Sequence, residues 1–309
     1  MTWNRRQFVK GSALGVLAGP GRRATTFAAA IPQSSSGLRV STGAFGHRRR
    51  VDSIDWYYEL RGQGPAIVLI PSGEGDCGSF DKVAALLSGA FTVLTFDMPG
   101  FSRSSEPPDF ANYSMDQAAS EVAGLVRALR LEPATFYGCS SGGQVALRLA
   151  ADHSALIRNV VVHEVAGLPV PGRSAPSPLS VTLAGFSKLT DGDVIRRCKE
   201  LFRNELNENA EAWEALGDTF HKRLERNYVT WVRRYVAASR PARQLAPEDL
   251  RRRPVTWTIG GLTPAAAFFG NVVAAHNAGI QVGLLMCKHF PQVSIPEVLA
   301  DHIANVARV

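Results

Sequence analysis

The sequence predicts an α/β protein with a mostly parallel central sheet, helices on both faces of that sheet and an inserted helical lid. Strand-like apolar runs alternate with helix-like segments along the first half of the chain, which is typical of a parallel sheet. One apolar run leads directly into a serine flanked by glycines, and a helical pattern follows at once. From residue 167 to 246 the pattern changes to charged helical sequence with aromatic residues, which indicates an insertion.

We place the sheet domain at residues 50–166 and 247–309, and the lid at residues 167–246. A chain of 309 residues, 45% of them hydrophobic, is long enough to bury one large core and a smaller lid. Its four cysteines are scattered and form no C-x-x-C pair, so we expect no disulfide framework, no metal and no cofactor. No apolar run reaches the roughly 20 residues that cross a bilayer, so no membrane partner is expected.

The elements of the sheet domain follow from local patterns. Ala66–Ile70 is a continuous apolar run, as expected of a strand buried on both faces. Ser114–Leu129 carries apolar residues at helical spacing. By these criteria we expect strands at residues 55–60, 66–70, 91–96, 134–137, 156–162, 254–259 and 280–285, and helices at residues 80–87, 114–129, 144–151 and 294–306.

The first 30 residues look like an export signal. A twin arginine, Arg5-Arg6, precedes a short apolar stretch, and three alanines at residues 28–30 resemble a cleavage site. We therefore expect a twin-arginine signal at residues 1–30 and an exported protein, with a basic N-terminus on a cytoplasmic protein as the alternative. Residues 31–49 are interpreted as a linker because serine, glycine and threonine dominate their first part.

The net charge of +7 does not indicate a nucleic-acid partner. Five of the seven excess positive charges lie in the first 30 residues, which contain no acid. The remaining basic clusters, Arg48–Arg50 and Arg251–Arg253, are short and are better interpreted as solvated segments that lead into strands. We therefore expect no nucleic-acid binding.

Gly138-Cys139-Ser140-Ser141-Gly142 forms a G-x-S-x-G pattern between a strand-like and a helix-like segment. On such a sharp turn the serine hydroxyl is exposed, and only very small residues fit two positions before and after it. The helix that follows offers unpaired N–H groups where an oxyanion would form. We predict Ser140 as a nucleophile, against the alternative of a glycine-rich turn with two ordinary serines.

A serine hydroxyl needs a base to take its proton, and that base works best when a carboxylate orients it. In α/β hydrolases the order along the chain is serine, acid, histidine, and the histidine follows the last strand. His289 is the only histidine in that position, after the strand-like run at residues 280–285 and before the final helix. We therefore predict His289 as the base.

The acid is assigned by elimination. In many α/β hydrolases it follows the strand after the lid, but here Pro254–Ile259 is followed by no carboxylate until Glu297. The other position that can reach the histidine is the end of the strand before the lid, and that strand ends at Glu164. We predict Glu164 as the acid. His163 would point to the opposite side of the strand and is given a structural role.

An oxyanion hole needs two N–H donors. Ser141 follows the nucleophile directly, and Gly73 lies on the loop after Ala66–Ile70, where a glycine lets the backbone approach a substrate carbonyl. We predict these two residues as the donors. Glu74 is awkward, because a carboxylate that faces the hole would repel the oxyanion, so we expect it to point to solvent.

These residues resemble the zearalenone hydrolases, lactonases of the α/β-hydrolase superfamily that open a resorcylic macrolactone. The likeness extends from about Asp55 to the C-terminus. The stretches that carry it are Thr95–Ser104, Gly138–Gly142, His163-Glu164, Gly217–Trp231, Trp257–Asn271 and Gly283–Pro296.

The resemblance implies a Ser–Glu–His triad with its glutamate after the strand before the lid, in agreement with Glu164. It also implies that Trp231 contacts the substrate, and we include Tyr235 as a second substrate-binding candidate. Without the resemblance this i,i+4 pair would be interpreted as lid core. Two departures, Ser72 where aspartate is expected and Val236 where proline is expected, bear on the substrate instead of the mechanism.

The predicted function is hydrolysis of an apolar lactone, zearalenone or a related resorcylic macrolactone, through an acyl-enzyme on Ser140. Two alternatives stay open. A general carboxylesterase or a C–C bond hydrolase would use the same triad, and a hydrolase-fold ligand-binding protein would retain the triad but turn over slowly. The expected partner is a small apolar lactone or ester, and a homodimer is left open.

Overall fold

The computed structural model describes residues 46–169, 178–237 and 240–309. The predicted export signal and the predicted linker up to residue 45 lie outside these residues. The last part of that linker is wrong as a prediction, because β1 (Gly46–Val51) pairs antiparallel with β2 (Ile54–Arg61). Five of the six residues of β1 are exposed, so no apolar pattern marks this edge strand in the sequence.

Six further strands complete the sheet in the described part of the chain: β3 (Ala66–Ile70), β4 (Thr92–Phe96), β5 (Ala134–Cys139), β6 (Ile157–His163), β7 (Val255–Gly260) and β8 (Val282–Leu285). Their spatial order is β1-β2-β4-β3-β5-β6-β7-β8. The β1–β2 and β2–β4 pairs are antiparallel, and all other pairs are parallel. The predicted α/β fold with a mostly parallel sheet is confirmed.

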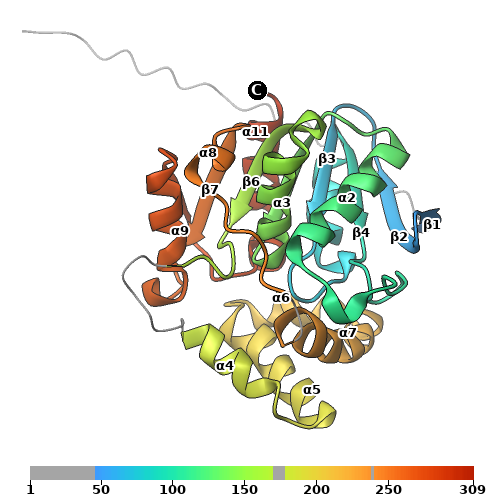
Figure 1. The fold of residues 1–309 in the computed structure, drawn as a ribbon, viewed down its shortest axis with the longest axis vertical. Coiled ribbons are helices and arrows are strands. Elements are labelled where there is room, and N and C mark those ends of the chain that lie inside the picture. The colour runs from blue at the N-terminus through green and yellow to red at the C-terminus, as the bar shows by residue number, and fades with distance from the viewer. Residues whose placement is uncertain (1–45, 170–177, 238–239) are drawn as a thin grey trace, which may run out of the picture. The chain divides into compact units, whose positions relative to one another are not determined.

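Helices cover both faces of this sheet (Figure 1). One face packs against α2 (Met115–Leu129), α3 (Ser141–Asp152) and α9 (Ala265–Asn277), and the other against α1 (Asp81–Leu87) and α11 (Pro296–Ala307).

The central strands alternate between the two hydrophobic clusters. Val160 and Val162 belong to the cluster with α2 and α3, and Val161 between them belongs to the cluster with α11. All three side chains are fully buried. Each contributes about 1.5–3 kcal/mol relative to an exposed position. Burial on both faces explains why these strands appear in the sequence as continuous apolar runs.

The segment between β6 and β7 is mainly helical where it is described. Its elements are α4 (Pro178–Phe186), α5 (Asp191–Glu200), η4 (Leu201–Glu205), α6 (Ala210–Glu214), α7 (Asp218–Thr230) and η5 (Trp231–Val236). We call residues 178–236 the cap. In Figure 1, α4 to α7 gather beyond one end of the sheet. Side chains of Thr190 and Asn209 accept backbone N–H groups at the starts of α5 and α6, which explains where these two helices begin.

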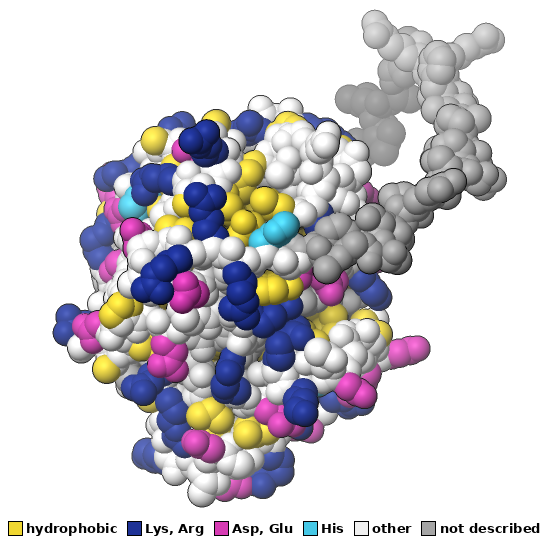
Figure 2. Space-filling model, turned by 90° about the vertical axis from the view of Figure 1, so that its right-hand side faces the viewer, with side chains coloured by type: hydrophobic (Ala, Val, Ile, Leu, Met, Phe, Trp, Pro, Cys, Tyr) yellow, Lys and Arg dark blue, Asp and Glu magenta, His cyan; other side chains and the backbone are white. Residues whose placement is uncertain are grey.

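Short elements complete the described chain: η1 (Cys77–Phe80), η2 (Phe110–Asn112), η3 (Ser154–Leu156), α8 (Pro247–Leu250) and α10 (Pro291–Ser294). Among the described residues, none of the helices has the length and apolar character to cross a membrane. Arg48, Arg49 and Arg50 are exposed on β1. Figure 2 shows Lys and Arg side chains interspersed with Asp and Glu on the face that it presents, as expected of a solvated surface.

Candidate active site

Ser140 lies at the sharp turn between β5 and α3. Its φ of 56° and ψ of −121° are conformations that residues other than glycine rarely adopt, so the turn is strained. Three backbone hydrogen bonds hold it: Ser140 N–H donates to His163 O at 3.1 Å, and Ser140 O accepts from the N–H groups of Gln144 and Ala166, each at 3.2 Å. This is the strand–turn–helix geometry that the G-x-S-x-G pattern predicts.

Glycine is required on both sides of the turn for steric reasons. A Cβ atom on Gly138 would lie 2.2 Å from the carbonyl oxygen of Gly142. A Cβ atom on Gly142 would lie 2.6 Å from the carbonyl oxygens of Ile70 and Pro71. Because these neighbours are backbone atoms, no side-chain rotation can relieve the overlap. The two glycines of the motif are therefore structural requirements of the turn that carries Ser140.

The structure brings Glu164 and His289 together although 125 residues separate them in the chain. His289 Nδ1 lies 2.7 Å from Glu164 Oε2, and Gly260 N–H donates to Glu164 Oε1 at 2.8 Å. Both side chains are buried, with 3% and 0% exposed for His289 and Glu164. Glu164 follows β6 with a φ of 42°, so the backbone turns out of the strand at this residue.

The surroundings favour the charged form of Glu164. Burial alone would raise the pKa of this carboxyl, but the hydrogen bond and charge of His289 outweigh it and lower the pKa below its ordinary value. Glu164 is therefore ionised at neutral pH. We assign the Nδ1–H tautomer to His289, because an ionised carboxylate can only accept at that contact. The basic nitrogen of the ring is then Nε2.

Neighbouring elements hold the loop that carries His289. His289 N–H donates to Leu206 O at 3.0 Å, and Lys288 N–H donates to Glu208 Oε2 at 2.8 Å, both in the cap. From β5, the thiol of Cys139 donates to His289 O at 2.9 Å. These bonds fix the backbone of the histidine from two sides, so its ring direction does not depend on Glu164 alone.

His163 supports the same loop from inside the sheet. Its Nδ1 lies 3.0 Å from Thr258 Oγ1, and its Nε2 lies 3.3 Å from Lys288 O. Burial lowers the pKa of His163 to about 4, so the ring is neutral at pH 7. A neutral ring can donate from Nε2 to the Lys288 carbonyl and accept at Nδ1. These contacts agree with the structural role predicted for His163.

The two predicted oxyanion donors follow neighbouring parallel strands. Ile70 of β3 pairs with Gly138 of β5, so the loops that begin after these strands meet at one edge of the sheet. Gly73 lies in a turn in which Gly75 N–H donates to Ser72 O at 3.1 Å. Ser141 is the first residue of α3, where N–H groups have no acceptor within the helix.

Trp231, at the start of η5, lies directly over Gly73. A Cβ atom on Gly73 would be 2.7 Å from Cε2 and Nε1 of the Trp231 indole, so only glycine allows this contact. Trp231 also packs edge-on against Phe202, with ring centroids 5.2 Å apart. The indole therefore lies at the loop that carries a predicted oxyanion donor, and its contact with a substrate stays a prediction.

Tyr235 lies in different surroundings. Its hydroxyl donates to Pro99 O at 3.0 Å, and its ring packs against Phe101, Phe110 and Tyr113, with centroids 4.8 to 5.8 Å apart. Ring and hydroxyl are both engaged with the sheet domain. The predicted substrate contact in this region therefore depends mainly on Trp231, and Tyr235 attaches the cap.

The expectation that Glu74 points to solvent is wrong. The residue is 1% exposed, and its Oε1 accepts a hydrogen bond from Ser79 Oγ at 2.9 Å. Two features turn it inward: Gly75, with a φ of 66°, closes the turn, and Asn227 Nδ2 donates to the Glu74 carbonyl at 2.8 Å. The expectation was wrong because the sequence shows only a charged residue on a loop, whereas in the structure the cap covers this loop.

Sequence reasoning missed the polar contacts that join this loop to the cap. Arg223 Nε and Nη2 donate to the two carboxylate oxygens of Asp76 at 2.6 and 3.0 Å. Asn227 Oδ1 accepts from Ser102 N–H at 2.9 Å, on the loop after β4. Arg223 and Asn227 both lie in the stretch Gly217–Trp231 that carries the family resemblance. The motif was the available signal, but a motif does not show which loop its side chains contact.

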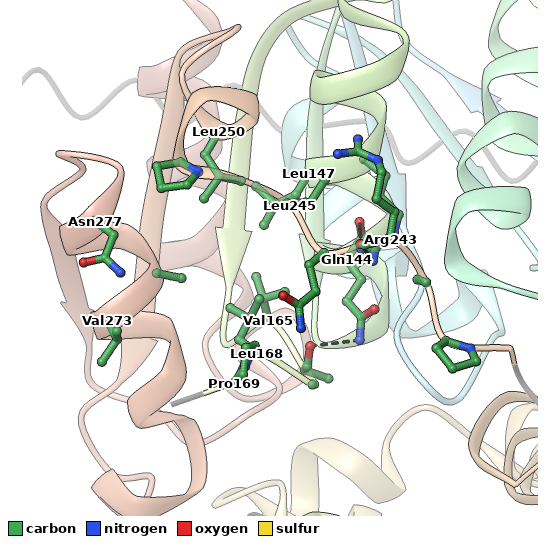
Figure 3. Close-up of a pocket in the computed structure, with 18 residues that line it drawn as sticks. Gln144, Leu147, Val165, Leu168, Pro169, Arg243, Leu245, Leu250, Val273 and Asn277 are labelled. Atoms are coloured by element: carbon green, nitrogen blue, oxygen red, sulfur yellow. Dashed lines mark hydrogen bonds between the residues drawn. The ribbon is translucent and has the colours of Figure 1, made fainter. Parts of the chain in front are cut away.

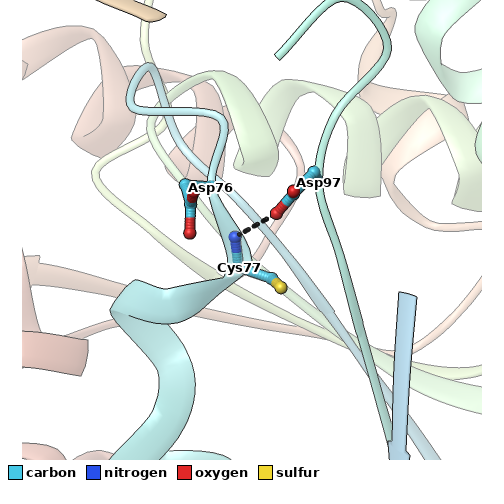
Figure 4. Close-up of side chains that lie close together, drawn as sticks. All are labelled: Asp76, Cys77 and Asp97. Carbon is cyan, nitrogen blue, oxygen red and sulfur yellow. Dashed lines mark hydrogen bonds between the residues drawn. The ribbon is translucent and has the colours of Figure 1, made fainter. Parts of the chain in front are cut away.

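Asp76 also lies close to Cys77 and Asp97 (Figure 4). Cys77 N–H donates to Asp97 Oδ1 at 3.0 Å. Arg103 Nε lies 2.6 Å from Asp97 Oδ2, and Arg223 binds Asp76, so guanidinium groups already balance both carboxylates. Burial raises the pKa of the Cys77 thiol well above its ordinary value, which keeps it neutral. We assign an ion-pair network to this cluster and propose no metal there.

A cavity of about 420 Å³ lies between α3, the loop after β6, residues 241–250 and α9 (Figure 3). Gln144 Nε2 donates to Ala166 O at 2.8 Å in its wall. Its lining includes Val165 and Ala166 but not Ser140, Glu164 or His289. The cavity is therefore distinct from the site that the triad candidates form.

Comparison with known proteins gives a consistent family. A sequence family described as alpha/beta hydrolase fold matches residues 65–197. Two relatives are zearalenone hydrolases: one from Bionectria ochroleuca, 37% identical over 83% of this chain and 95% of its own length, and one from Cladophialophora bantiana, 36% identical over 83% and 94%.

Solved structures share the fold at lower identity. The enol-lactonase from Burkholderia xenovorans LB400 matches with a TM-score of 0.66 at 20% identity, over 85% of this chain and 100% of that one. Est816, described as an N-acyl homoserine lactone degrading enzyme, matches with a TM-score of 0.64 at 20% identity, over 84% and 99%. At this identity the two structures show the fold alone, and the family follows from the closer relatives. The chain belongs to the zearalenone hydrolase family of α/β hydrolases.

Proposed function

We propose that this protein is a serine hydrolase that opens zearalenone or a related resorcylic macrolactone through an acyl-enzyme on Ser140. The substrate part of the proposal rests on the two relatives, whose alignments include 83% of this chain. One observation supports the chemistry above all others. The buried 2.7 Å contact between Glu164 and His289 lies at the same edge of the sheet as the strained turn of Ser140.

In the acylation step, Nε2 of His289 takes the proton of the Ser140 hydroxyl while Oγ attacks the lactone carbonyl carbon. The N–H groups of Gly73 and Ser141 stabilise the negative oxygen of the tetrahedral intermediate. The intermediate collapses by breaking the lactone C–O bond, and His289 gives its proton to the departing alkoxide. Glu164 stays ionised and stabilises the imidazolium during this exchange.

Deacylation repeats the same proton transfers with water as the nucleophile. His289 takes a proton from water, the resulting hydroxide attacks the acyl carbon, and the ester bond to Ser140 breaks. The serine oxygen recovers its proton from His289. The product carries a free carboxylate and a free hydroxyl where the lactone was closed.

The cap is proposed to act as a lid that shapes the substrate site. Trp231 offers a large aromatic face beside Gly73, which suits a flat, apolar resorcylic ring. The Asp76–Arg223 and Asn227–Ser102 contacts connect this face to the sheet domain. The substrate ring would therefore be held at a defined height above the oxyanion donors.

The test is incubation with zearalenone, with loss of the lactone followed by chromatography for the wild type, Ser140→Ala and Glu164→Gln. The proposal expects turnover by the wild type, none above background for Ser140→Ala and strongly reduced turnover for Glu164→Gln. An intact lactone with active enzyme, scored on an activated ester, would contradict the named substrate. Full activity of Glu164→Gln would contradict the acid assignment.

A substrate panel separates the alternatives. A preference for simple alkyl esters by orders of magnitude in kcat/KM would favour a general carboxylesterase, and cleavage of a 1,5-diketone would favour a C–C bond hydrolase. A single stoichiometric turnover on every ester, with ligand bound tightly, would favour a slow ligand-binding protein. Repeated turnover on the macrolactone, lost in Ser140→Ala, favours the lactonase.

We also propose that the protein is exported, on the strength of Arg5-Arg6 and the apolar stretch that follows. Fractionation of the producing cell tests this. The wild type is expected outside the cytoplasm, and a variant with both arginines changed to lysine is expected inside it. Equal distribution of the two proteins would contradict export by this signal.

A further inference from the structure

Glu74 directly follows the proposed oxyanion donor Gly73, its carboxyl is buried, and it has no part in the mechanism above. Gly73 and Glu74 are the two central residues of the turn that Gly75 N–H and Ser72 O close at 3.1 Å. Glu74 Oε1 accepts from Ser79 Oγ, whereas Oε2 is buried without a hydrogen-bond partner. An ionised carboxylate is costly to bury in this way, so the geometry favours the neutral acid.

Three titratable side chains interact electrostatically with Glu74 and carry no positive charge. Tyr137 and Cys139 belong to β5 and Tyr228 to α7, and burial raises the pKa of each well above its ordinary value. All three are therefore neutral at pH 7. Asp76, on the same loop, is held in its ionised form by Arg223 and repels a second anion.

These surroundings move the titration of Glu74 toward neutral pH. Burial is the largest effect and raises the pKa of Glu74 to about 7, with a smaller contribution from Asp76. The hydrogen bond from Ser79 and the backbone groups of Ser72 and Glu74 itself act in the opposite direction. A modest pH change around neutrality therefore changes the charge beside Gly73.

We propose that Glu74 is a positioning residue of the oxyanion loop, whose neutral acid form supports the reaction and whose carboxylate form suppresses it. The inference rests on the proposed function, because it assumes that Gly73 N–H stabilises the oxyanion. A negative charge one residue away opposes the negative charge that develops on the substrate oxygen. Buried surroundings screen that repulsion weakly.

We therefore expect an alkaline loss of activity: kcat/KM should fall as pH rises through about 7, because Glu74 ionises. Ionisation of Glu74 should lower kcat/KM by roughly tenfold or more through kcat, with little change in KM, because the repulsion is felt mainly in the transition state.

The experiment compares pH profiles of kcat and KM for the wild type, Glu74→Gln and the exposed control Glu211→Gln. Glutamine keeps the size of the side chain and stays neutral at every pH. Glu74→Gln is expected to match the wild type near pH 6, to lack the alkaline loss and to exceed the wild type by roughly tenfold at pH 9. Glu211→Gln is expected to follow the wild-type profile throughout.

Ser79→Ala provides a second, independent test, because it should change the pH at which the alkaline loss of activity occurs. The Ser79 hydrogen bond favours the charged form of Glu74, so its removal should move the alkaline loss to higher pH without abolishing it. A merely structural role of Glu74 would lower activity equally at all pH values and would not respond to Ser79→Ala in this direction.

Thermal unfolding detects the ionisation of Glu74 without any measurement of enzyme activity. The folded-state pKa of Glu74, about 7, lies above the ordinary 4.5, so protonated Glu74 stabilises the folded protein relative to the unfolded chain. This stabilisation is fully present below about pH 4.5 and is lost as pH rises through 7. The melting temperature of the wild type should therefore fall more between pH 5 and 8 than that of Glu74→Gln. This readout separates failure of the inference from failure of the proposed function.

Two results would overturn the inference. One is a loss of activity at alkaline pH that is the same in the wild type and in Glu74→Gln. The other is a Glu74→Gln protein that melts like the wild type at pH 5 but has lost its activity at every pH, because that would require the charged carboxylate. If Ser140→Ala retains wild-type activity, the proposed function fails on its own, whatever the Glu74 profiles show.

Discussion

His289 Nδ1 and Glu164 Oε2 lie 2.7 Å apart in a buried setting, and the second oxygen of Glu164 is occupied by Gly260 N–H at 2.8 Å. The carboxylate is therefore fixed by two donors, one at the end of β7 and one on the loop after β8, before any substrate arrives. This arrangement orients the ring of His289 and selects its tautomer. The first prediction follows from it.

Glu164→Gln should keep the fold and lose most of the rate. The amide has nearly the shape of the carboxylate but cannot stabilise an imidazolium, so kcat should fall by roughly 10³- to 10⁴-fold with little change in KM. Steady-state kinetics on zearalenone measure this. The exposed Glu211→Gln serves as the control, and a loss below tenfold in Glu164→Gln would contradict the acid assignment.

Asp76→Asn should loosen the attachment of the cap. Asp76 is fully buried, and Arg223 donates to both of its oxygens, so the change should cost about 3 kcal/mol of unfolding free energy. We expect the lower end of the range for buried pairs because Arg223 is 24% exposed. Denaturant unfolding measures the loss, and Asp193→Asn, in an exposed pair with Arg196, should change stability very little.

The same pair gives stability a pH dependence. Burial alone would raise the pKa of Asp76, but Arg223 and Arg103 outweigh it and hold the pKa below the ordinary 3.8. This contribution is therefore fully present above about pH 4 and is lost as pH falls through the folded-state pKa. Asp76→Asn should unfold with a flatter acid profile than the wild type, and equal slopes would contradict the ion-pair assignment.

Gly138→Ala should prevent formation of the serine turn. The added Cβ would lie 2.2 Å from a backbone carbonyl, so the protein should lose several kcal/mol of stability or fail to accumulate as folded protein. Gly192→Ala is the matched control, since a Cβ there meets nothing within 4 Å and the site lies in α5. That change should be neutral or stabilising by up to about 1 kcal/mol. A soluble, stable Gly138→Ala protein would contradict the turn.

Trp231→Ala should weaken substrate binding more than the chemistry. Loss of the aromatic face beside Gly73 should raise KM for zearalenone by roughly tenfold or more, while kcat on a small activated ester changes little. Tyr235→Phe is the control, because its hydroxyl contacts Pro99 instead of the donor loop. An unchanged KM in Trp231→Ala would remove this residue from the substrate site.

Much of the site could be predicted from the sequence because its determinants are local. The strained turn at Ser140 needs glycines at fixed spacing, and the positions of Glu164 and His289 after their strands follow from the chain order. The absence of an acid after β7 pointed to Glu164 without any structure.

Contacts between distant segments could not be predicted in this way. Glu74 looked like a surface residue because nothing local shows that the cap buries its loop. The partnership of Asp76 with Arg223 joins residues 147 positions apart, and neither neighbourhood carries a pattern that identifies the other. The strand β1 was missed because five of its six residues are exposed and its centre, His47–Arg50, is basic, so no alternation of apolar and polar residues marks it.

The central claim is that Ser140 forms a covalent acyl intermediate. Rapid acid quench during turnover of zearalenone, followed by intact-mass and peptide analysis, tests it most directly. Because the departing hydroxyl stays attached to the opened ring, the account predicts an adduct equal to the whole substrate mass on the peptide that contains Ser140. The adduct should be absent in Ser140→Ala, which should also be inactive. An adduct on another residue, or turnover by Ser140→Ala at the wild-type rate, would contradict the account.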